Sequence, residues 1–151
     1  MLNEIRELLD LAMDREIAAE AFYIAGQRKT TDPGAVELMR ELAAEESKHY
    51  RRIKALKEDG LNSQKLPSGK LADLMLSEYL LDTPISEAAT LQDVITAAMK
   101  REQYSQEFYA KMTQLSENKA FQQLCERLMQ EERKHKAKLE IFYDDFFYKE
   151  N

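Results

Sequence analysis

The chain has 151 residues, of which 33% are charged and 44% hydrophobic, and it contains four Gly, three Pro and no Trp. One domain of this size can bury a proper core, and the scarcity of helix breakers predicts an all-α fold. The net charge of −6 argues against nucleic acid, the lack of a long apolar run argues against a membrane span, and the lone Cys125 excludes an intrachain disulfide and fits a cytoplasmic location.

Four long helices are predicted in chain order. They cover about residues 3–29, 33–58, 90–115 and 118–147. Asp32 can cap the second helix, with Pro33 in its first turn, and Thr90 and Asn118 can cap the third and fourth. Residues 59–89 form the connection between the second and third helices, and a short apolar helix is expected within it.

The loop lengths predict how the helices are connected. Short loops join the first helix to the second and the third to the fourth, so each pair forms an antiparallel hairpin. Roughly 30 residues separate the hairpins, and a connection of that length must cross the bundle. The expected architecture is a single ferritin-like four-helix bundle over residues 1–151, with helical repeats at about 3–58 and 90–147.

The two hairpins are also related in sequence. Residues 12–49 align with 98–135 without a gap, and 12 of the 38 positions are identical at this offset of 86. A long repeat that occurs only twice indicates two fused hairpins rather than a solenoid. A pseudo-twofold axis between them would turn equivalent residues toward each other.

Both histidines of the chain stand three residues after a glutamate, in Glu46-x-x-His49 and Glu132-x-x-His135. Residues at i and i+3 share one face of a helix, and each pair interrupts an apolar stripe. A further glutamate lies on the apolar stripe of the first helix and another at the equivalent position of the third. Two lone glutamates and two such pairs are the ligand set of a carboxylate-bridged two-metal site in a four-helix bundle. The predicted ligands are Glu16, Glu46, His49, Glu102, Glu132 and His135.

Charge favours two metal ions at this site. A carboxylate in a bundle core is costly unless its charge is neutralised, and four together repel one another. Four carboxylates and two divalent ions sum to zero, and two neutral imidazoles complete the set. The mixed oxygen and nitrogen ligands favour two iron ions, while manganese or zinc also fits. Six residues do not saturate two octahedral ions, which leaves positions for an oxidant.

Other residues near the ligands receive weaker predictions. Tyr23 and Tyr109 lie two turns beyond the lone glutamates, where each hydroxyl could bond a ligand carboxylate of the opposite repeat. The alternative is that both are core aromatics whose hydroxyls reach the nearest acceptor. Glu45 and Glu131 precede the ligand glutamates by one residue and are expected to be solvated. The aromatic run 142–148 is expected to pack against the crossover or a second subunit.

These motifs resemble the rubrerythrin family of ferritin-like proteins, over most of the chain. The matching patterns are Glu16-x-x-Ala-x-x-Phe-Tyr, Glu46-x-x-His49, Glu102-x-x-Ser-x-x-Phe-Tyr and Glu132-x-x-His135. The resemblance implies that Glu46 and Glu132 bridge two irons and that Glu16 and Glu102 are terminal ligands. It also implies reduction of hydrogen peroxide or dioxygen by the diferrous centre, and a homodimer or a larger assembly.

Two departures from the family pattern qualify this resemblance. Rubrerythrins proper carry a rubredoxin domain with two Cys-x-x-Cys motifs, whereas this chain has one cysteine, so a separate donor such as a rubredoxin-type protein is expected. Ser105 stands where the family has an additional glutamate, which makes the site more symmetric and closer to bacterioferritin-like centres. Two alternatives stay open: a ferroxidase that handles iron, and a metal-bound bundle with an assembly or sensing role and no redox turnover.

Overall fold

The computed structural model describes residues 5–59 and 85–148 and has the all-α architecture that the sequence predicts. Its elements are α1 (Ile5–Gln27), α2 (Pro33–Glu58), α4 (Leu91–Met112), the 3-10 turn η3 (Thr113–Leu115) and α5 (Lys119–Phe147). The third helix was predicted to reach residue 115, but its last three residues form η3 instead, with the Thr113 hydroxyl donating to the Ala110 carbonyl. The short helix predicted within 59–89 lies mostly outside the described residues.

The predicted caps are confirmed at the starts of three helices. The Asp32 carboxylate accepts a hydrogen bond from the Ala35 backbone N–H at 2.9 Å. Thr90 and Asp93 exchange both hydrogen bonds of a capping box, and the Asn118 side chain accepts from the backbone of α5. Such caps satisfy N–H groups that a helix leaves unpaired and contribute about 1 kcal/mol each. They set the point at which each helix begins, and so the register of the residues that follow.

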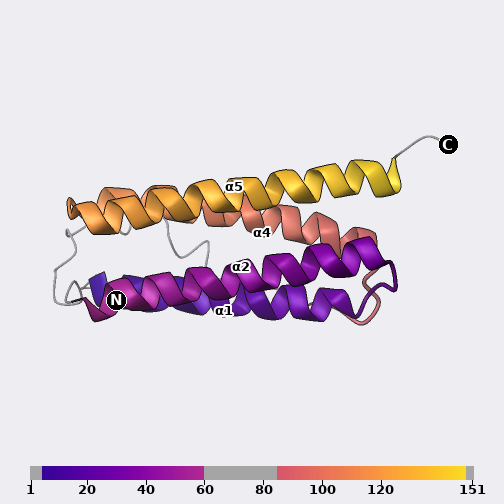
Figure 1. The fold of residues 1–151 in the computed structure, drawn as a ribbon, viewed down its shortest axis with the longest axis horizontal. Helices are drawn as coiled ribbons and strands as arrows, with labels where there is room; N and C mark the ends of the chain where they lie inside the picture. Colours follow the sequence, from indigo (N-terminus) through magenta and orange to yellow (C-terminus); the bar gives the residue numbers. More distant parts are fainter. Residues whose placement is uncertain (1–4, 60–84, 149–151) are drawn as a thin grey trace.

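The helices form two layered hairpins (Figure 1). Helix α1 packs along α2, and α4 packs along α5, while α2 faces α5 and α1 faces α4. Helix α2 ends at the opposite end of the bundle from the start of α4. Lys29, just beyond α1, donates to the Glu87 carbonyl at 2.9 Å, which ties the end of the first helix to the start of the third. The connection between the hairpins therefore joins opposite ends, as the predicted ferritin-like topology requires.

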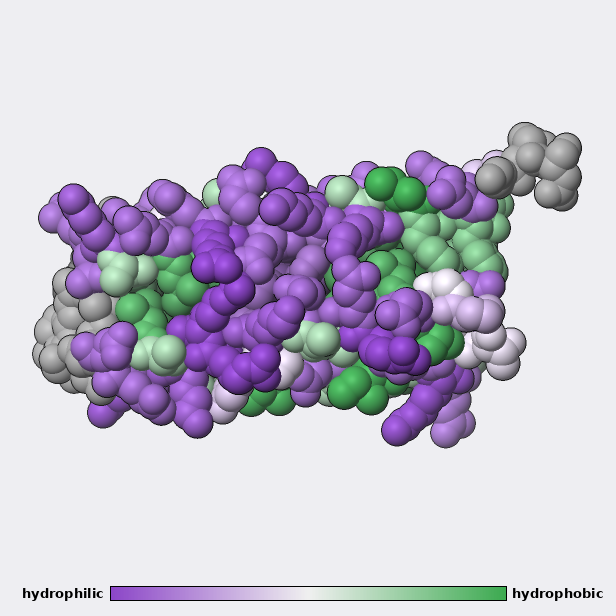
Figure 2. Space-filling model, viewed as in Figure 1, coloured by the Kyte–Doolittle hydropathy of each residue, from purple (hydrophilic) through white to green (hydrophobic). Residues whose placement is uncertain are grey.

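The core consists of two hydrophobic clusters with charged residues between them. One cluster surrounds Leu9, Phe108 and Phe121 at one end of the bundle, and the other surrounds Met39 and Ile95 at the opposite end. Their separation places the middle of the bundle in a water-poor but polar environment. None of the described helices is both long and apolar enough to cross a bilayer. The face formed by α2 and α5 is hydrophilic along its middle (Figure 2).

The C-terminal half of α5 carries the aromatic run that the sequence singled out. Tyr143 packs toward α4, where its hydroxyl accepts a hydrogen bond from Gln92 at 2.8 Å. The rings of Phe142 and Phe146 stack with centroids 5.2 Å apart. Ile141 and Phe146 remain 62% and 46% exposed. Contact with the crossover falls outside the described residues, and contact with a second subunit stays a prediction.

Candidate metal centre

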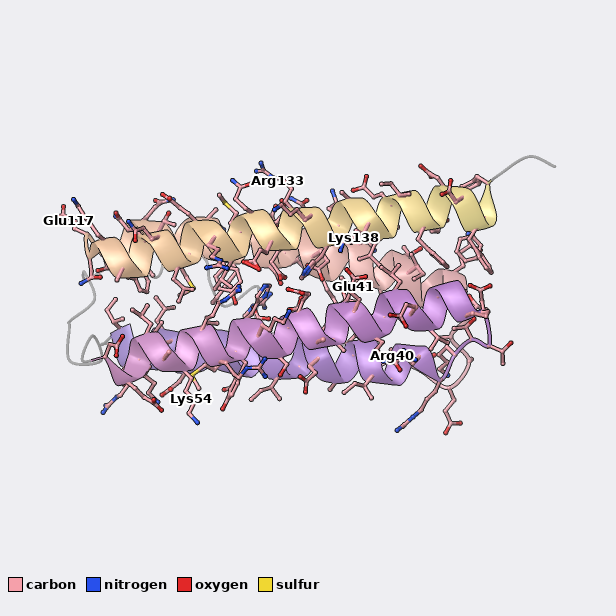
Figure 3. The ribbon with its side chains drawn as sticks, viewed as in Figure 1. Arg40, Glu41, Lys54, Glu117, Arg133 and Lys138 are labelled. Atoms are coloured by element: carbon pink, nitrogen blue, oxygen red, sulfur yellow. The ribbon has the colours of Figure 1, made fainter. Side chains whose placement is uncertain are left out.

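The structure brings all six predicted ligands together at mid-length of the bundle, between the two hydrophobic clusters. One comes from α1, one from α4, and a pair from each of α2 and α5, because the i, i+3 spacing turns both members of a pair inward. They are Glu16, Glu46, His49, Glu102, Glu132 and His135, and none is more than 4% exposed. Nitrogen and oxygen atoms gather between the helical layers at this level (Figure 3).

The six residues form two overlapping groups with ligand atoms within 4.8 Å of one another. One group is Glu16, Glu46, His49 and Glu132, and the other is Glu46, Glu102, Glu132 and His135. Glu46 and Glu132 belong to both groups, so each carboxylate is positioned to contact two ions. The arrangement could therefore hold two metal ions that share two carboxylates.

Distances around the imidazoles follow the pseudo-twofold symmetry of the repeat. His49 Nδ1 lies 3.0 Å from Glu132 Oε1 and 3.5 Å from Glu16 Oε2. On the other side, His135 Nδ1 lies 3.1 Å from Glu46 Oε1. The two rings are nearly parallel, at 11°, with centroids 5.6 Å apart. Each histidine thus lies nearest to the ligand glutamate of the opposite hairpin, so neither hairpin completes a metal position by itself.

Every one of the six has a buried nitrogen or oxygen atom without a hydrogen-bond partner. These atoms are Glu16 Oε2, both carboxylate oxygens of Glu46, His49 Nδ1, Glu102 Oε2, Glu132 Oε1 and His135 Nδ1. An unsatisfied buried polar atom costs about 1–3 kcal/mol, and several converging on one point is expensive. Coordination to cations satisfies all of them together. The donor atoms present therefore fit a pair of divalent metal ions.

Two buried tyrosines hold the terminal carboxylates. The Tyr23 hydroxyl donates to Glu102 Oε1, and the Tyr109 hydroxyl donates to Glu16 Oε1. These are the hydrogen bonds across the repeat that the sequence predicted. Burial, and then the charges of the nearby carboxylates, raise the pKa of both tyrosines well above the usual value. Each hydroxyl therefore keeps its proton and fixes one oxygen of a carboxylate, while the other oxygen faces the centre.

The imidazoles carry protons in the metal-free protein. Burial alone would lower the pKa of His49, but the close carboxylates of Glu132 and Glu16 outweigh burial and raise the pKa to about 11. The pKa of His135 is raised to about 9, since the close carboxylates of Glu102 and Glu132 likewise outweigh burial. Both side chains are cationic at neutral pH without metal, and binding a cation at Nδ1 must displace these protons.

The pKa values of three of the carboxylates are shifted, and not all in the same direction. Burial and the charge of Glu132 raise the pKa of Glu46 well above its usual value, and the same two causes raise that of Glu102 to about 8. Burial would raise the pKa of Glu132, but the close imidazoles of His135 and His49 outweigh burial and lower it. Protons thus neutralise part of the negative charge that metal ions neutralise in the loaded site.

Sequence reasoning was wrong about Glu131, which was expected to be solvated. Both of its oxygens accept from Arg52 Nη1 at 2.9 Å, and Oε2 also accepts from Arg127 Nε at 3.1 Å. Its Oε1 lies 3.5 Å from His49 Nε2. The carboxylate therefore lies over the outer edge of a ligand histidine. The i, i+4 spacing from Arg127 was visible in the sequence, but Arg52 comes from another helix, and only the packing of α2 on α5 brings it close.

Two arginines near the centre were also missed. The Arg15 guanidinium lies over the Phe108 ring at 4.7 Å, and that of Arg101 lies over Phe22 at 4.6 Å. Both arginines are identical in the repeat alignment, which is the signal that could have found them. Arg15 also donates to Ser105 Oγ at 3.3 Å, so the serine at the family's extra-glutamate position bonds a cation beside the centre. The Phe108 and Phe22 rings, besides packing in the core, each support a guanidinium.

Comparisons with known proteins agree with this fold. A family model described as rubrerythrin matches residues 1–57, which contain α1 and nearly all of α2. Among solved structures, a hypothetical protein from Pyrococcus furiosus matches with a TM-score of 0.70 and 24% identity, covering 93% of this chain and 89% of that one. Identity at this level shows a likeness of fold. No curated protein matches the chain. The resemblance to the rubrerythrin family is thus confirmed for the first hairpin.

Proposed function

We propose that this rubrerythrin-type chain holds two iron ions and that the loaded centre is oxidised by hydrogen peroxide or dioxygen. The observation that carries the proposal is the pair of overlapping ligand groups, each with one histidine and three glutamates. Their inward atoms are buried and lack hydrogen-bond partners, which is the state of a site built for cations. Manganese or zinc would satisfy the same atoms.

Each residue has a role in this proposal. Glu46 and Glu132 would bridge the two ions, because both belong to both ligand groups. Glu16 and Glu102 would be terminal ligands, one for each ion, beside the histidine of the same group. Their second oxygens are held by tyrosine hydroxyls, which orient the carboxylates across the repeat. The symmetry predicts two similar ion positions rather than one strong and one weak.

When bound, a pair of ferrous ions supplies two electrons to the oxidant. The chain contributes the surroundings in which this happens. Four carboxylates balance the charge of two divalent ions, and hydrophobic clusters on both sides limit the access of water. Six side chains leave coordination positions open for a small molecule. The proposal includes a separate electron donor, such as a rubredoxin-type protein, a cytoplasmic location and a homodimer.

Metal content tests the first part of the proposal. Elemental analysis of purified protein and titration of the metal-free chain with Fe²⁺ are expected to give two ions per chain. A matched control is Glu37→Gln, which removes an exposed carboxylate paired with Arg40 and leaves the centre untouched. Fewer than one ion per chain in the unsubstituted protein would overturn the proposal.

Rapid mixing of the Fe²⁺-loaded protein tests the reaction. Faster oxidation by peroxide than by dioxygen, with repeated turnover when a reductant is added, is the expected result. Faster oxidation by dioxygen with release of iron afterwards would favour a ferroxidase that handles iron. If neither oxidant reacts while two ions remain bound, the redox proposal is wrong and an assembly or sensing role gains support.

A further inference from the structure

A pocket of about 540 Å³ opens on the face formed by α2 and α5, directly outside the metal centre. It is lined by Glu45, Arg127, Gln130, Glu131, Lys134, His135 and Lys138. His135 is only 4% exposed, yet it lines this pocket with one edge and belongs to the inner ligand groups with the other. The pocket therefore reaches from solvent to a ligand of the centre.

The pocket reflects a difference between the two halves of the repeat. On the His49 side, Glu131 is held over the imidazole by Arg52 and Arg127, so that face is closed by a network of ion pairs. His49 is accordingly 0% exposed. The equivalent residue on the other side, 86 positions earlier, is Glu45. Its neighbours differ from those of Glu131, and they decide whether the second face closes.

Glu45 pairs with Lys48 of its own helix at 3.2 Å instead of being held across the helices. Lys138, which corresponds to Arg52, bonds Glu41 and points toward it across α2 and α5 (Figure 3). Among these described residues, no pair of basic side chains holds Glu45 as Arg52 and Arg127 hold Glu131. The Glu45 side chain is 27% exposed at the pocket, where a hydrated ion can reach it.

Glu45 also belongs to a third group of potential metal ligands. A carboxylate oxygen of Glu45 and one ring nitrogen each of His49 and His135 lie within 4.8 Å of one another. Both ring nitrogens of His49 are buried without a hydrogen-bond partner, so this histidine brings an unsatisfied nitrogen to the group. One carboxylate and two imidazoles are a donor set for divalent transition-metal ions.

We propose that Glu45, His49 and His135 form an outer divalent-cation site, through which metal ions pass from the pocket to the inner centre. This inference rests on the proposed two-metal function. The outer site shares both histidines with the inner positions, and cations at both places repel one another. Occupancy of the outer site is therefore weak and transient when the inner centre is full. The outer site is therefore occupied while the centre is being loaded, and it holds no ion in the fully loaded protein.

The charge of the pocket makes Glu45 decisive for this passage. Three basic side chains and two carboxylates line it, so the charges of the lining do not by themselves favour a cation. Glu131 is already engaged by Arg52 and Arg127. Glu45 is paired only with the half-exposed Lys48 of its own helix, so its carboxylate is the one that can turn to an incoming ion and supply the first local attraction.

Loading kinetics test the inference with Co²⁺ as the probe. The metal-free full-length chain is mixed with Co²⁺, and the absorption of the bound ion is followed in time. Glu45→Gln is expected to slow loading about tenfold while the protein still takes up two ions at equilibrium. Glu37→Gln, which removes the same charge two turns away on α2, is expected to load at the unsubstituted rate. Loading of Glu45→Gln at the unsubstituted rate would overturn the outer site.

A second measurement detects the outer site directly. In the double variant Glu46→Gln, Glu132→Gln, both shared carboxylates are removed, and a weakly bound Co²⁺ that disappears on adding Glu45→Gln is expected. Weak binding that is indifferent to Glu45, or no binding in the double variant, contradicts the inference. Different results contradict the two proposals. An unsubstituted chain that binds no Co²⁺ contradicts the metal centre itself. Two bound ions, with a loading rate that Glu45→Gln leaves unchanged, contradict only the outer site.

Discussion

The two hairpins agree closely inside the bundle and differ on its surface. Around the centre, each supplies a lone glutamate, a glutamate–histidine pair and a tyrosine whose hydroxyl reaches into the other repeat. Outside, Glu131 is clamped by two arginines, whereas its equivalent Glu45 pairs only within its own helix. The inner set needs both hairpins for each ion, so its symmetry is tied to ligation. The residues outside the centre are not constrained by ligation. The ion pairs of Glu131 cover His49, whereas His135 lines a pocket.

The largest effect is expected from removing a shared carboxylate. Glu46→Gln and Glu132→Gln should each reduce metal content from two ions to at most one and weaken affinity by at least about 100-fold. The symmetry predicts equal losses in the two variants, measured by elemental analysis and Co²⁺ titration. A variant that keeps both ions at full affinity would break the assignment of that residue as a bridge.

The metal-free protein should lose stability as pH rises from 5 to 9. Glu102, with a pKa near 8 in the fold against 4.5 unfolded, binds a proton that favours folding, and this contribution fades between those values. His49 and His135, raised from 6.5 to about 11 and 9, contribute fully below pH 6.5 and less as pH climbs. All three shifts have the same sign.

Thermal unfolding followed by circular dichroism measures this pH dependence. The melting temperature of the metal-free chain is expected to fall by several degrees across the range. Metal loading should raise the melting temperature by an amount that grows with pH. The reason is that ligation releases the same protons, so metal affinity rises with pH. A metal-free melting temperature that rises with pH would show that the buried groups are not protonated as described.

Substitution of the two tyrosines tests whether the two ion positions are equivalent, with a smaller expected loss of metal affinity. Tyr23→Phe and Tyr109→Phe each remove one hydroxyl that orients a terminal carboxylate, and each should weaken metal affinity by about 10–100-fold. Titrations of the two variants should agree with each other. Unequal losses would mean that the two ion positions differ, despite the matching hydrogen bonds.

The smallest effect is expected at Ser105, where the two repeats depart from each other. Ser105→Ala removes the acceptor of the Arg15 hydrogen bond and should lower the free energy of unfolding by about 1 kcal/mol. The substitution places alanine at the position equivalent to Ala19, so the repeats become alike there. Ser47→Ala is the matched control, because it removes an exposed acceptor of Arg51 and should cost close to nothing. Equal costs in urea unfolding would remove any special role for Ser105.

Much of the fold and the inner site followed from patterns local to each helix. Caps at Asp32, Thr90 and Asn118 were recognisable because a side chain bonds the backbone only three residues later. The turn at η3 was not anticipated, since Thr113–Leu115 continues the helical pattern in sequence. There the bond of the Thr113 hydroxyl to a carbonyl three residues earlier accompanies the tighter turn.

The sequence by itself determined which residues face inward, because the periods of an α-helix and an 86-residue repeat assign faces without knowledge of neighbours. It therefore identified all six candidate ligands and both tyrosines. Only the tertiary structure decided what lies around them. It formed the ion pairs of Glu131, placed the two arginine side chains over the phenylalanine rings of the opposite hairpin, and left the pocket beside His135. These contacts depend on how far α2 slides and rotates against α5, and α1 against α4. Side-chain packing over the whole bundle sets that offset, and no short stretch of sequence records it.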